Sequence, residues 1–146
     1  LAHLYDDALE AGGFLADMLE RTLAGRGGPV DVPPDAGDDY IHVEDACEAV
    51  WAIARAGAER LYLVASGETV DHQTLLGVLG ERAGVPLEPS RPPEGGPILA
   101  FDGARLATEL GLRPRPLSEG LDQVLTHQHN RRAMLSMMGV TQMPWM

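Results

Sequence analysis

The fold is decided by one stretch, Asp39-Tyr40-Ile41-His42-Val43-Glu44-Asp45-Ala46-Cys47-Glu48-Ala49-Val50, in which a strand passes directly into a helix. Its first half, Tyr40 to Val43, is a short run of residues with high strand propensity. Asp45 and Glu48 have the spacing of a helix-capping pair, and acidic residues stabilise a helix N-terminus. We therefore expect a strand followed at once by a helix that ends at Gly57.

Periodic apolar residues predict further elements on both sides of this stretch. Helices are expected at 13–24, 72–82, 103–110 and 118–138. The last of these helices is expected to bury Leu121, Val124 and Leu125. A continuous apolar run at Leu61–Ala65 predicts a buried strand, and Val85–Glu88 predicts a weak edge strand, because its proline has no N–H to donate. Short strands that alternate with helices predict an α/β fold.

The charge balance excludes several classes of function. The 146 residues include 22 acidic and 11 basic ones, and the formal net charge is -11. Nucleic acids and anionic membrane surfaces both require clustered positive charge, so neither is an expected partner. Every one of the 11 basic residues is arginine. The absence of lysine excludes a Schiff base, a phosphate-loop lysine and a tyrosine–lysine pair within this chain.

Length and composition predict one soluble domain. Hydrophobic residues make up 45% of the chain, and no apolar run approaches the roughly 18 residues that a membrane-spanning helix needs. Leu1–Asp7 has neither the basic region nor the apolar core of a signal peptide, so a cytoplasmic protein is expected. The one cysteine, Cys47, allows no intrachain disulfide, and its apolar-periodic surroundings predict that it is buried.

The order of these motifs resembles the C-terminal, substrate-binding half of the extended short-chain dehydrogenases/reductases, the family of NAD-dependent epimerases and dehydratases. The first stretch quoted above is similar almost letter for letter to that family's DYIHVEDVAEAV segment. Three further stretches carry the likeness: Leu61–Val70, Asp102–Leu112 and Pro116–Leu121. The resemblance implies a small α/β substrate-binding lobe with a few short, mostly parallel strands and four to five helices.

The resemblance also divides the single domain, 1–146, into three parts. Residues 1–28 are similar to the family's linking strand and the helix that follows it. Residues 29–125 resemble the substrate lobe itself, and residues 126–146 form a helical extension with a Met-rich tail beyond the likeness.

The motifs of the family's other half are missing from this chain. No glycine-rich turn with the spacing of a dinucleotide site lies between a strand and a helix, and there is no tyrosine-x-x-x-lysine pair. We therefore expect no catalytic and no cofactor-binding residue here, and no cofactor bound by this chain alone. NAD or NADP is expected only where the nucleotide-binding half is present.

The function that the resemblance implies is the substrate-binding portion of an NAD(P)-dependent epimerase, dehydratase or reductase. Its substrate would be a sugar-nucleotide-like or other hydroxylated small molecule. The expected protein partner is the missing half or a second copy of the chain. Two alternatives remain open: a free-standing, non-redox binding or assembly module, and a small cofactor-free enzyme with new chemistry.

Three residues are candidates for substrate contact by resemblance. Arg91 lies in a loop similar to one whose arginine grips a substrate phosphate, and a planar guanidinium suits that task. Its alternative role is that of an exposed loop residue beside acidic neighbours. Tyr40 and His42 belong to the family's most distinctive motif, where the histidine mainly holds the entry of the helix. The tyrosine is expected to pack its ring and to find a hydrogen-bond partner for its hydroxyl.

One departure from the family's pattern bears on the substrate. Many relatives carry an arginine two residues before the motif tyrosine, where it supports the substrate's pyrophosphate. This chain has Asp38 at that position and Asp39 after it. Two carboxylates would repel a diphosphate.

The C-terminal region predicts association and no metal site. His127 and His129 lie two residues apart, so they face different sides of a helix and cannot bind one ion together. Met134, Met137 and Met138 give the last helix an apolar end, which would need a partner if exposed. A homo-oligomer is therefore expected.

Overall fold

The computed structural model describes residues 1–95, 98 and 100–139, so the expectations for the tail beyond Gly139 lie outside this part of the chain. In chain order, its elements are β1 (His3–Tyr5), α1 (Gly13–Leu23), β2 (Gly28–Val30), β3 (Gly37–His42), α2 (Val43–Ala56), β4 (Thr69–Asp71), α3 (His72–Ala83), β5 (Leu87–Pro89), α4 (Ala104–Leu110) and α5 (Leu117–Met137). The expected α/β fold with five helices and short strands is confirmed.

The strands form two small sheets. In the first, β3 is central and pairs in parallel with β1, with His3 opposite Tyr40 and Tyr5 opposite His42. The other edge of β3 pairs antiparallel with β4. The second sheet consists of β2 and β5, which pair in parallel. Two of the three pairings are therefore parallel, as expected.

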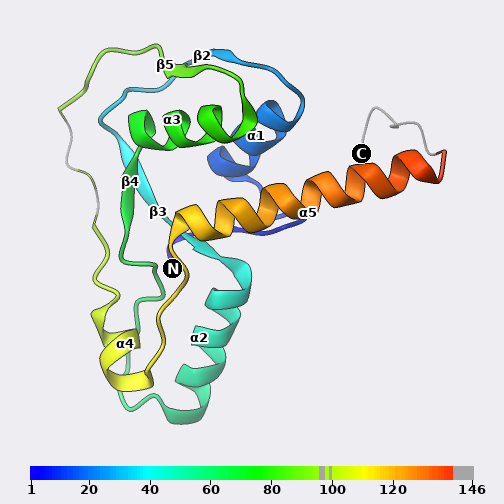
Figure 1. The fold of residues 1–146 in the computed structure, drawn as a ribbon. Coiled ribbons are helices and arrows are strands. Elements are labelled where there is room, and N and C mark those ends of the chain that lie inside the picture. Colours follow the sequence, from blue (N-terminus) through cyan, green and yellow to red (C-terminus); the bar gives the residue numbers. More distant parts are fainter. Residues whose placement is uncertain (96–97, 99, 140–146) are drawn as a thin grey trace.

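Alternation along β3 separates two hydrophobic cores. Successive side chains of a strand point to opposite faces, and Tyr40 and Ile41 accordingly lie in different clusters. Tyr40 packs in the cluster formed by α1, α3 and α5, whereas Ile41 packs in the cluster under α2 and α4. Figure 1 shows α1 and α3 at one end of the long strand β3, and α2 and α4 at its other end.

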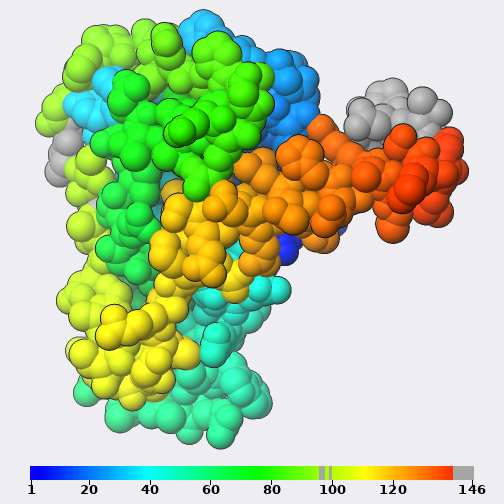
Figure 2. Space-filling view, viewed as in Figure 1, coloured from blue at the N-terminus to red at the C-terminus, as the bar shows by residue number. Residues whose placement is uncertain are grey.

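The longest helix, α5, crosses the molecule between these groups. Its first half buries Leu121, Val124 and Leu125, as the spacing predicted. Its second half projects away from the body as an arm (Figures 1 and 2). Arg132 donates a hydrogen bond to the carbonyl oxygen of Leu23 at the end of α1, and Met137, near the tip, is 82% exposed. No helix among the described residues is long and apolar enough to cross a membrane.

Two predictions about local structure are wrong. Leu61–Ala65 is not a strand: a main-chain hydrogen bond of 2.8 Å joins the N–H of Ala2 to Val64 O, but no ladder forms, and Leu61 is 80% exposed. Only the last two residues of this run, Val64 and Ala65, are buried. Cys47 is exposed, because the buried face of α2 is the one that carries Ala46 and Ala49.

The second sheet was only partly expected. The predicted edge strand at Val85–Glu88 is displaced to β5, and its partner β2 lies at the start of a stretch whose prolines and glycines predict turns. Each strand has three residues, so neither has enough alternation to be recognised without the other.

Candidate functional site

His42 stands at the junction of β3 and α2 and caps the helix. Its Nδ1 accepts a hydrogen bond from the N–H of Glu44 at 3.3 Å, and its Nε2 lies 3.3 Å from Oδ1 of Asp7. The imidazole is 1% exposed. Nε2 therefore carries the proton and donates it to Asp7 in the neutral ring. The predicted capping pair of Asp45 and Glu48 is wrong, because the histidine takes the capping position and frees Asp45 for another contact.

That contact is with Arg115, which precedes α5. Nε and Nη2 of the guanidinium donate to the carboxylate oxygens of Asp45 at 2.8–3.1 Å. Nη2 also donates to Glu44 at 3.0 Å, and Nη1 donates to Gln123 at 2.6 Å. The hydrogen bonds with Asp45 raise the pKa of Arg115 above its ordinary value. A bidentate arginine–carboxylate pair fixes both partners in orientation as well as in distance.

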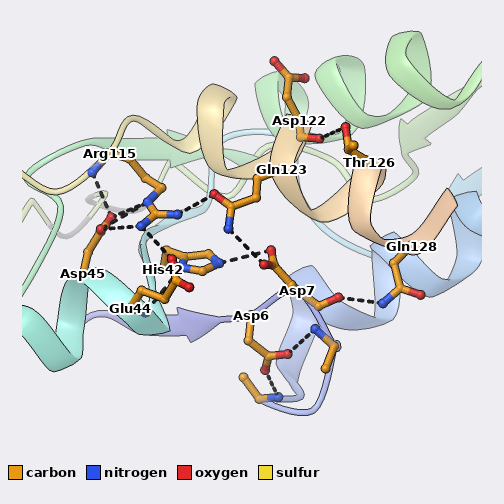
Figure 3. Close-up of polar contacts among 12 residues, drawn as sticks. Asp6, Asp7, His42, Glu44, Asp45, Arg115, Asp122, Gln123, Thr126 and Gln128 are labelled. Atoms are coloured by element: carbon orange, nitrogen blue, oxygen red, sulfur yellow. Dashed lines mark hydrogen bonds and ion pairs between the residues drawn. The ribbon is translucent and has the colours of Figure 1, made fainter. Parts of the chain in front are cut away.

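The polar contacts continue from Arg115 to the loop after β1 (Figure 3). Gln123 accepts from Arg115 and donates to Oδ2 of Asp7 at 2.9 Å, while Gln128 donates to the main-chain oxygen of Asp7 at 2.6 Å. Asp7 in turn contacts His42. This polar network therefore ties the loop after β1, the start of α2 and the first half of α5 to one another.

Sequence reasoning missed the network, and the one signal for it was an arginine placed between two prolines before the last helix. Arg115 lies in the Pro-Arg-Pro turn before α5, and Asp45 lies 70 residues earlier in the strand-to-helix motif. Charge alone does not identify such a pair, because the chain has 22 acidic residues that the arginine could meet.

Tyr40 and Tyr5 place two hydroxyls in the core without a partner. Tyr40 is 3% exposed and Tyr5 is 1% exposed, and neither Oη has a hydrogen-bond partner among the described residues. Burial raises the pKa of both phenols. Tyr5 stands edge-on to His42, with the ring centres 5.1 Å apart. The ring of Tyr40 packs in the core as expected, but the hydrogen-bond partner expected for its hydroxyl is missing among the described residues.

Arg91 lies apart from Tyr40 and His42, in the loop after β5. It forms an ion pair with Glu94, three residues later, and its side chain is about half exposed. The two oxygens of Asp35 accept hydrogen bonds from the N–H groups of Glu94 and Gly95, at 2.9 and 2.6 Å. Among the described residues, no contact joins Arg91 to either of the other two candidates.

Asp38, at the position of the family's arginine, and the next residue, Asp39, have different environments. Asp39 is fully buried and accepts hydrogen bonds from the N–H groups of Ser66 and Gly67, at 2.9 and 2.8 Å. Asp38 is partly exposed and lies 3.3 Å from Nε2 of His3. Asp39 therefore holds a turn, and only Asp38 remains accessible to a ligand.

A large hollow lies on another part of the surface. It is an open cavity of about 1040 Å³ between the start of α2, the Ser66-Gly67 turn, α4 and the start of α5. Arg115 and Asp45 contribute to its wall, but Tyr40, His42 and Arg91 do not. Among the described residues, no three His, Cys, Asp or Glu side chains gather as metal ligands would.

Two helices of the described part, α2 and α3, follow a strand directly, and a capping side chain occupies the N-terminus of each. A pyrophosphate needs free N–H groups at a helix N-terminus. At α2, Nδ1 of His42 accepts a hydrogen bond from the N–H of Glu44, and the next residue, Asp45, carries a negative charge that would repel a phosphate. At α3, the carboxylate of Asp71 takes the N–H of Thr74 at 2.6 Å. Both junctions therefore place a side chain where the phosphate would bind.

Comparisons with known proteins gave matches to solved structures only. No family model and no curated protein sequence matches the chain. The UDP-glucose 4-epimerase of Thermotoga maritima, solved with UDP-glucose, aligns with a TM-score of 0.71 and 24% identity over 91% of this chain and 45% of its own. The UDP-glucose 4-epimerase of Thermus thermophilus, solved with NAD, aligns with a TM-score of 0.68 and 25% identity over 86% of this chain and 44% of its own.

A dTDP-glucose 4,6-dehydratase from Bacillus anthracis, solved with NAD, aligns with a TM-score of 0.73 and 15% identity over 88% of this chain and 43% of its own. The fold is that of the C-terminal half of an extended short-chain dehydrogenase/reductase. The lobe spans less than half the length of each of these matched enzymes. The neighbours named here are two UDP-glucose 4-epimerases and a dTDP-glucose 4,6-dehydratase, and this chain shares the fold of part of each.

Proposed function

We propose that this chain is the substrate-binding lobe of an NAD(P)-dependent epimerase, dehydratase or reductase that acts on a sugar-nucleotide-like or other hydroxylated small molecule. One observation carries the proposal: 86–91% of this chain aligns with less than half the length of each of three enzymes, which were solved with NAD or with a UDP-sugar. The remaining half of such an enzyme would hold the dinucleotide and the tyrosine–lysine pair, which this chain does not contain.

The described residues support a binding role rather than a chemical one. The polar network fixes the loop after β1 against α2 and α5. It would therefore hold the end of β3 in one conformation for a substrate that binds there. Arg91 is the residue proposed to contact a substrate directly, and Tyr40 and His42 are proposed to shape the pocket from β3. NAD or NADP bound in the other half would exchange a hydride with a carbon of the substrate.

The coding sequence upstream of Leu1 tests this proposal. We expect an in-frame strand–helix segment with a glycine-rich phosphate-binding motif, followed by tyrosine-x-x-x-lysine. The longer product should bind NAD or NADP, which absorbance at 340 nm after reduction would detect. A start codon directly before Leu1 and no such segment would contradict the proposal and favour the free-standing module.

The exposed end of α5 supports a protein partner. Met134, Met137 and Met138 are 53%, 82% and 68% exposed, on an arm that projects beyond the core. Methionine-rich surfaces adapt to apolar partners. We propose that either the missing half or a second copy of the lobe covers this arm, giving a homo-oligomer in the second case.

A further inference from the structure

The arm formed by the second half of α5 is positively charged, whereas the rest of the protein is acidic. All 22 acidic residues precede Gln123, and the two side chains after it that are charged at neutral pH are Arg131 and Arg132. Arg132 donates to the carbonyl oxygen of Leu23 and holds the arm on the body. Arg131 is exposed and has no hydrogen-bond or ion-pair partner among the described residues. Its charge is therefore free to attract the surface of another molecule.

One outward face of α5 runs from its acidic start to the tip of the arm. An α-helix turns by about 100° per residue, so Glu119, Met134 and Met137 lie within about 60° of one another around the axis. The buried residues Leu121 and Val124 lie on the other side of the helix. The exposed methionines at the tip thus share a face with an exposed carboxylate at the start.

The open cavity of about 1040 Å³ lies beside the start of this face, because Glu119 and Gln123 belong to its wall. The charged side chains of the wall include more carboxylates than guanidiniums, and they are Glu44, Asp45, Asp102, Arg113, Arg115 and Glu119. The apolar residues of the wall are Phe101, Ala104, Ala107, Leu112, Pro114 and Pro116. The cavity therefore suits apolar side chains that arrive together with positive charge.

Two copies of the lobe with antiparallel α5 helices would bring these features together. In such a pair, related by a two-fold axis, the tip of each helix lies beside the start of the other. The helix has 21 residues and is therefore about 30 Å long, and the cavity lies at one of its ends and the methionines at the other. Each arm would then reach the cavity of the other copy, and the two identical contacts would close as a dimer.

We propose that the arm of α5 is a self-docking element, in which Met134 and Met137 of one copy insert into the cavity of a second copy and Arg131 approaches its acidic wall. Methionine side chains are flexible enough to fill an irregular apolar surface. The chain itself offers the complementary cavity, so a second copy supplies everything that the arm needs. This inference goes beyond the proposed function and does not depend on it, because it concerns two surfaces of the lobe alone.

Sedimentation equilibrium on the full 146-residue chain tests the inference. We expect a dimer with a dissociation constant of tens of micromolar or tighter. Met134→Asp combined with Met137→Asp should weaken the dimer at least about tenfold, and so should Glu119→Arg, which places positive charge where the arm docks. All three positions are exposed, so far-UV circular dichroism of the variants should match the wild type.

Glu88→Arg is the matched control, because Glu88 is an exposed acidic residue on β5, outside the wall of the cavity. It makes the same change of charge as Glu119→Arg and should leave the dissociation constant unchanged. A wild-type monomer at about 100 µM would overturn the inference and leave the missing half as the partner of the arm. A dimer that neither Glu119→Arg nor the methionine variant weakens would also overturn it, because its contact would lie elsewhere.

Disulfide trapping locates the contact. Cys47, the one cysteine, is exposed, so all chains carry Cys47→Ser. A Met137→Cys chain mixed with an Ala107→Cys chain under mild oxidation should form a mixed disulfide, because Ala107 belongs to the wall of the cavity. A Met137→Cys chain mixed with a Glu88→Cys chain should not. Equal yields from the two mixtures would contradict docking in the cavity, whereas failure of the proposed function shows separately, in the upstream coding sequence.

Discussion

The seating of α5 on β1 depends on a residue without a side chain, Gly120. A Cβ added there would lie 1.8 Å from Oη of Tyr5, 2.7 Å from its Cζ and 3.0 Å from its Cε2. The phenol has no room to retreat, because its ring is buried and stands edge-on to His42. Gly120→Ala therefore forces either the ring or the helix to move.

The expected size of this effect follows from two opposing contributions. Overpacking a core costs roughly 1–3 kcal/mol, and alanine is favoured over glycine inside a helix by about 1 kcal/mol. Contacts as short as these place the cost toward the upper end, so we expect Gly120→Ala to lower the free energy of unfolding by about 1–2 kcal/mol. Urea unfolding followed by far-UV circular dichroism measures it.

Gly77→Ala in α3 is the matched control. Gly77 is exposed and helical, and no atom lies within 4 Å of a Cβ added there. This variant should gain about 0.5–1 kcal/mol from helix propensity alone. The double variant Gly120→Ala with Tyr5→Phe should recover part of the loss, because the shortest contact disappears. If Gly120→Ala were stabilised as much as Gly77→Ala, α5 would not pack on Tyr5 as described.

Three further predictions concern the polar network, the buried phenols and association. Arg115→Ala should lower the free energy of unfolding by about 2–3 kcal/mol, because it leaves the carboxylate of Asp45 without its charged partner, whereas Arg113→Ala, at an exposed position, should change it by less than about 0.5 kcal/mol. Equal effects of the two would contradict the network. Because burial raises the pKa of Tyr5 and Tyr40, stability should be intact below the ordinary phenol pKa of 10.0 and should fall as the pH rises above it. Urea midpoints at about pH 8 and about pH 11 measure this loss of stability, and the chain has no lysine to titrate in that range. A Tyr5→Phe, Tyr40→Phe variant that kept the full alkaline loss would show that the two buried phenols are not its cause. Light scattering should show a homodimer or larger for the full chain and a monomer for a chain that ends at Asn130; a full-length monomer at tens of micromolar would contradict association, and an assembly that survives truncation would place the contact elsewhere.

The local parts of the fold could be predicted from the sequence. The helix boundaries at α1, α2 and α3 follow from apolar spacing and from Gly57, Asp71 and Gly84, each of which lies directly next to the helix that it ends or begins. Asp71 caps α3 as its position indicates, and Gly84 ends that helix in the left-handed region, at φ 66°. These features depend on neighbouring residues only.

The parts that sequence reasoning missed depend on residues far apart. The pairing of β2 with β5 joins positions about 60 residues apart, and Arg115 reaches Asp45 across 70. Leu61–Ala65 shows the converse error: five consecutive apolar residues predict a strand, but burial needs a second surface to pack on, and only the end of the run meets one. For the candidate site, the family resemblance pointed to His42 and Arg91 but not to their acidic partners, Asp7 and Glu94.

The central claim is that this lobe belongs to a dinucleotide enzyme whose cofactor site lies outside the lobe. Calorimetric titration of NAD(H) and NADP(H) into the 146-residue chain, and into the longer product of the same gene, tests it most directly. We expect no binding to the lobe, because it has no glycine-rich strand-to-helix turn, and because His42 and Asp71 cap α2 and α3, the helices that follow a strand directly. We expect one dinucleotide bound per chain in the longer product. Micromolar affinity of the lobe alone for either dinucleotide, or none in the longer product, would contradict the account.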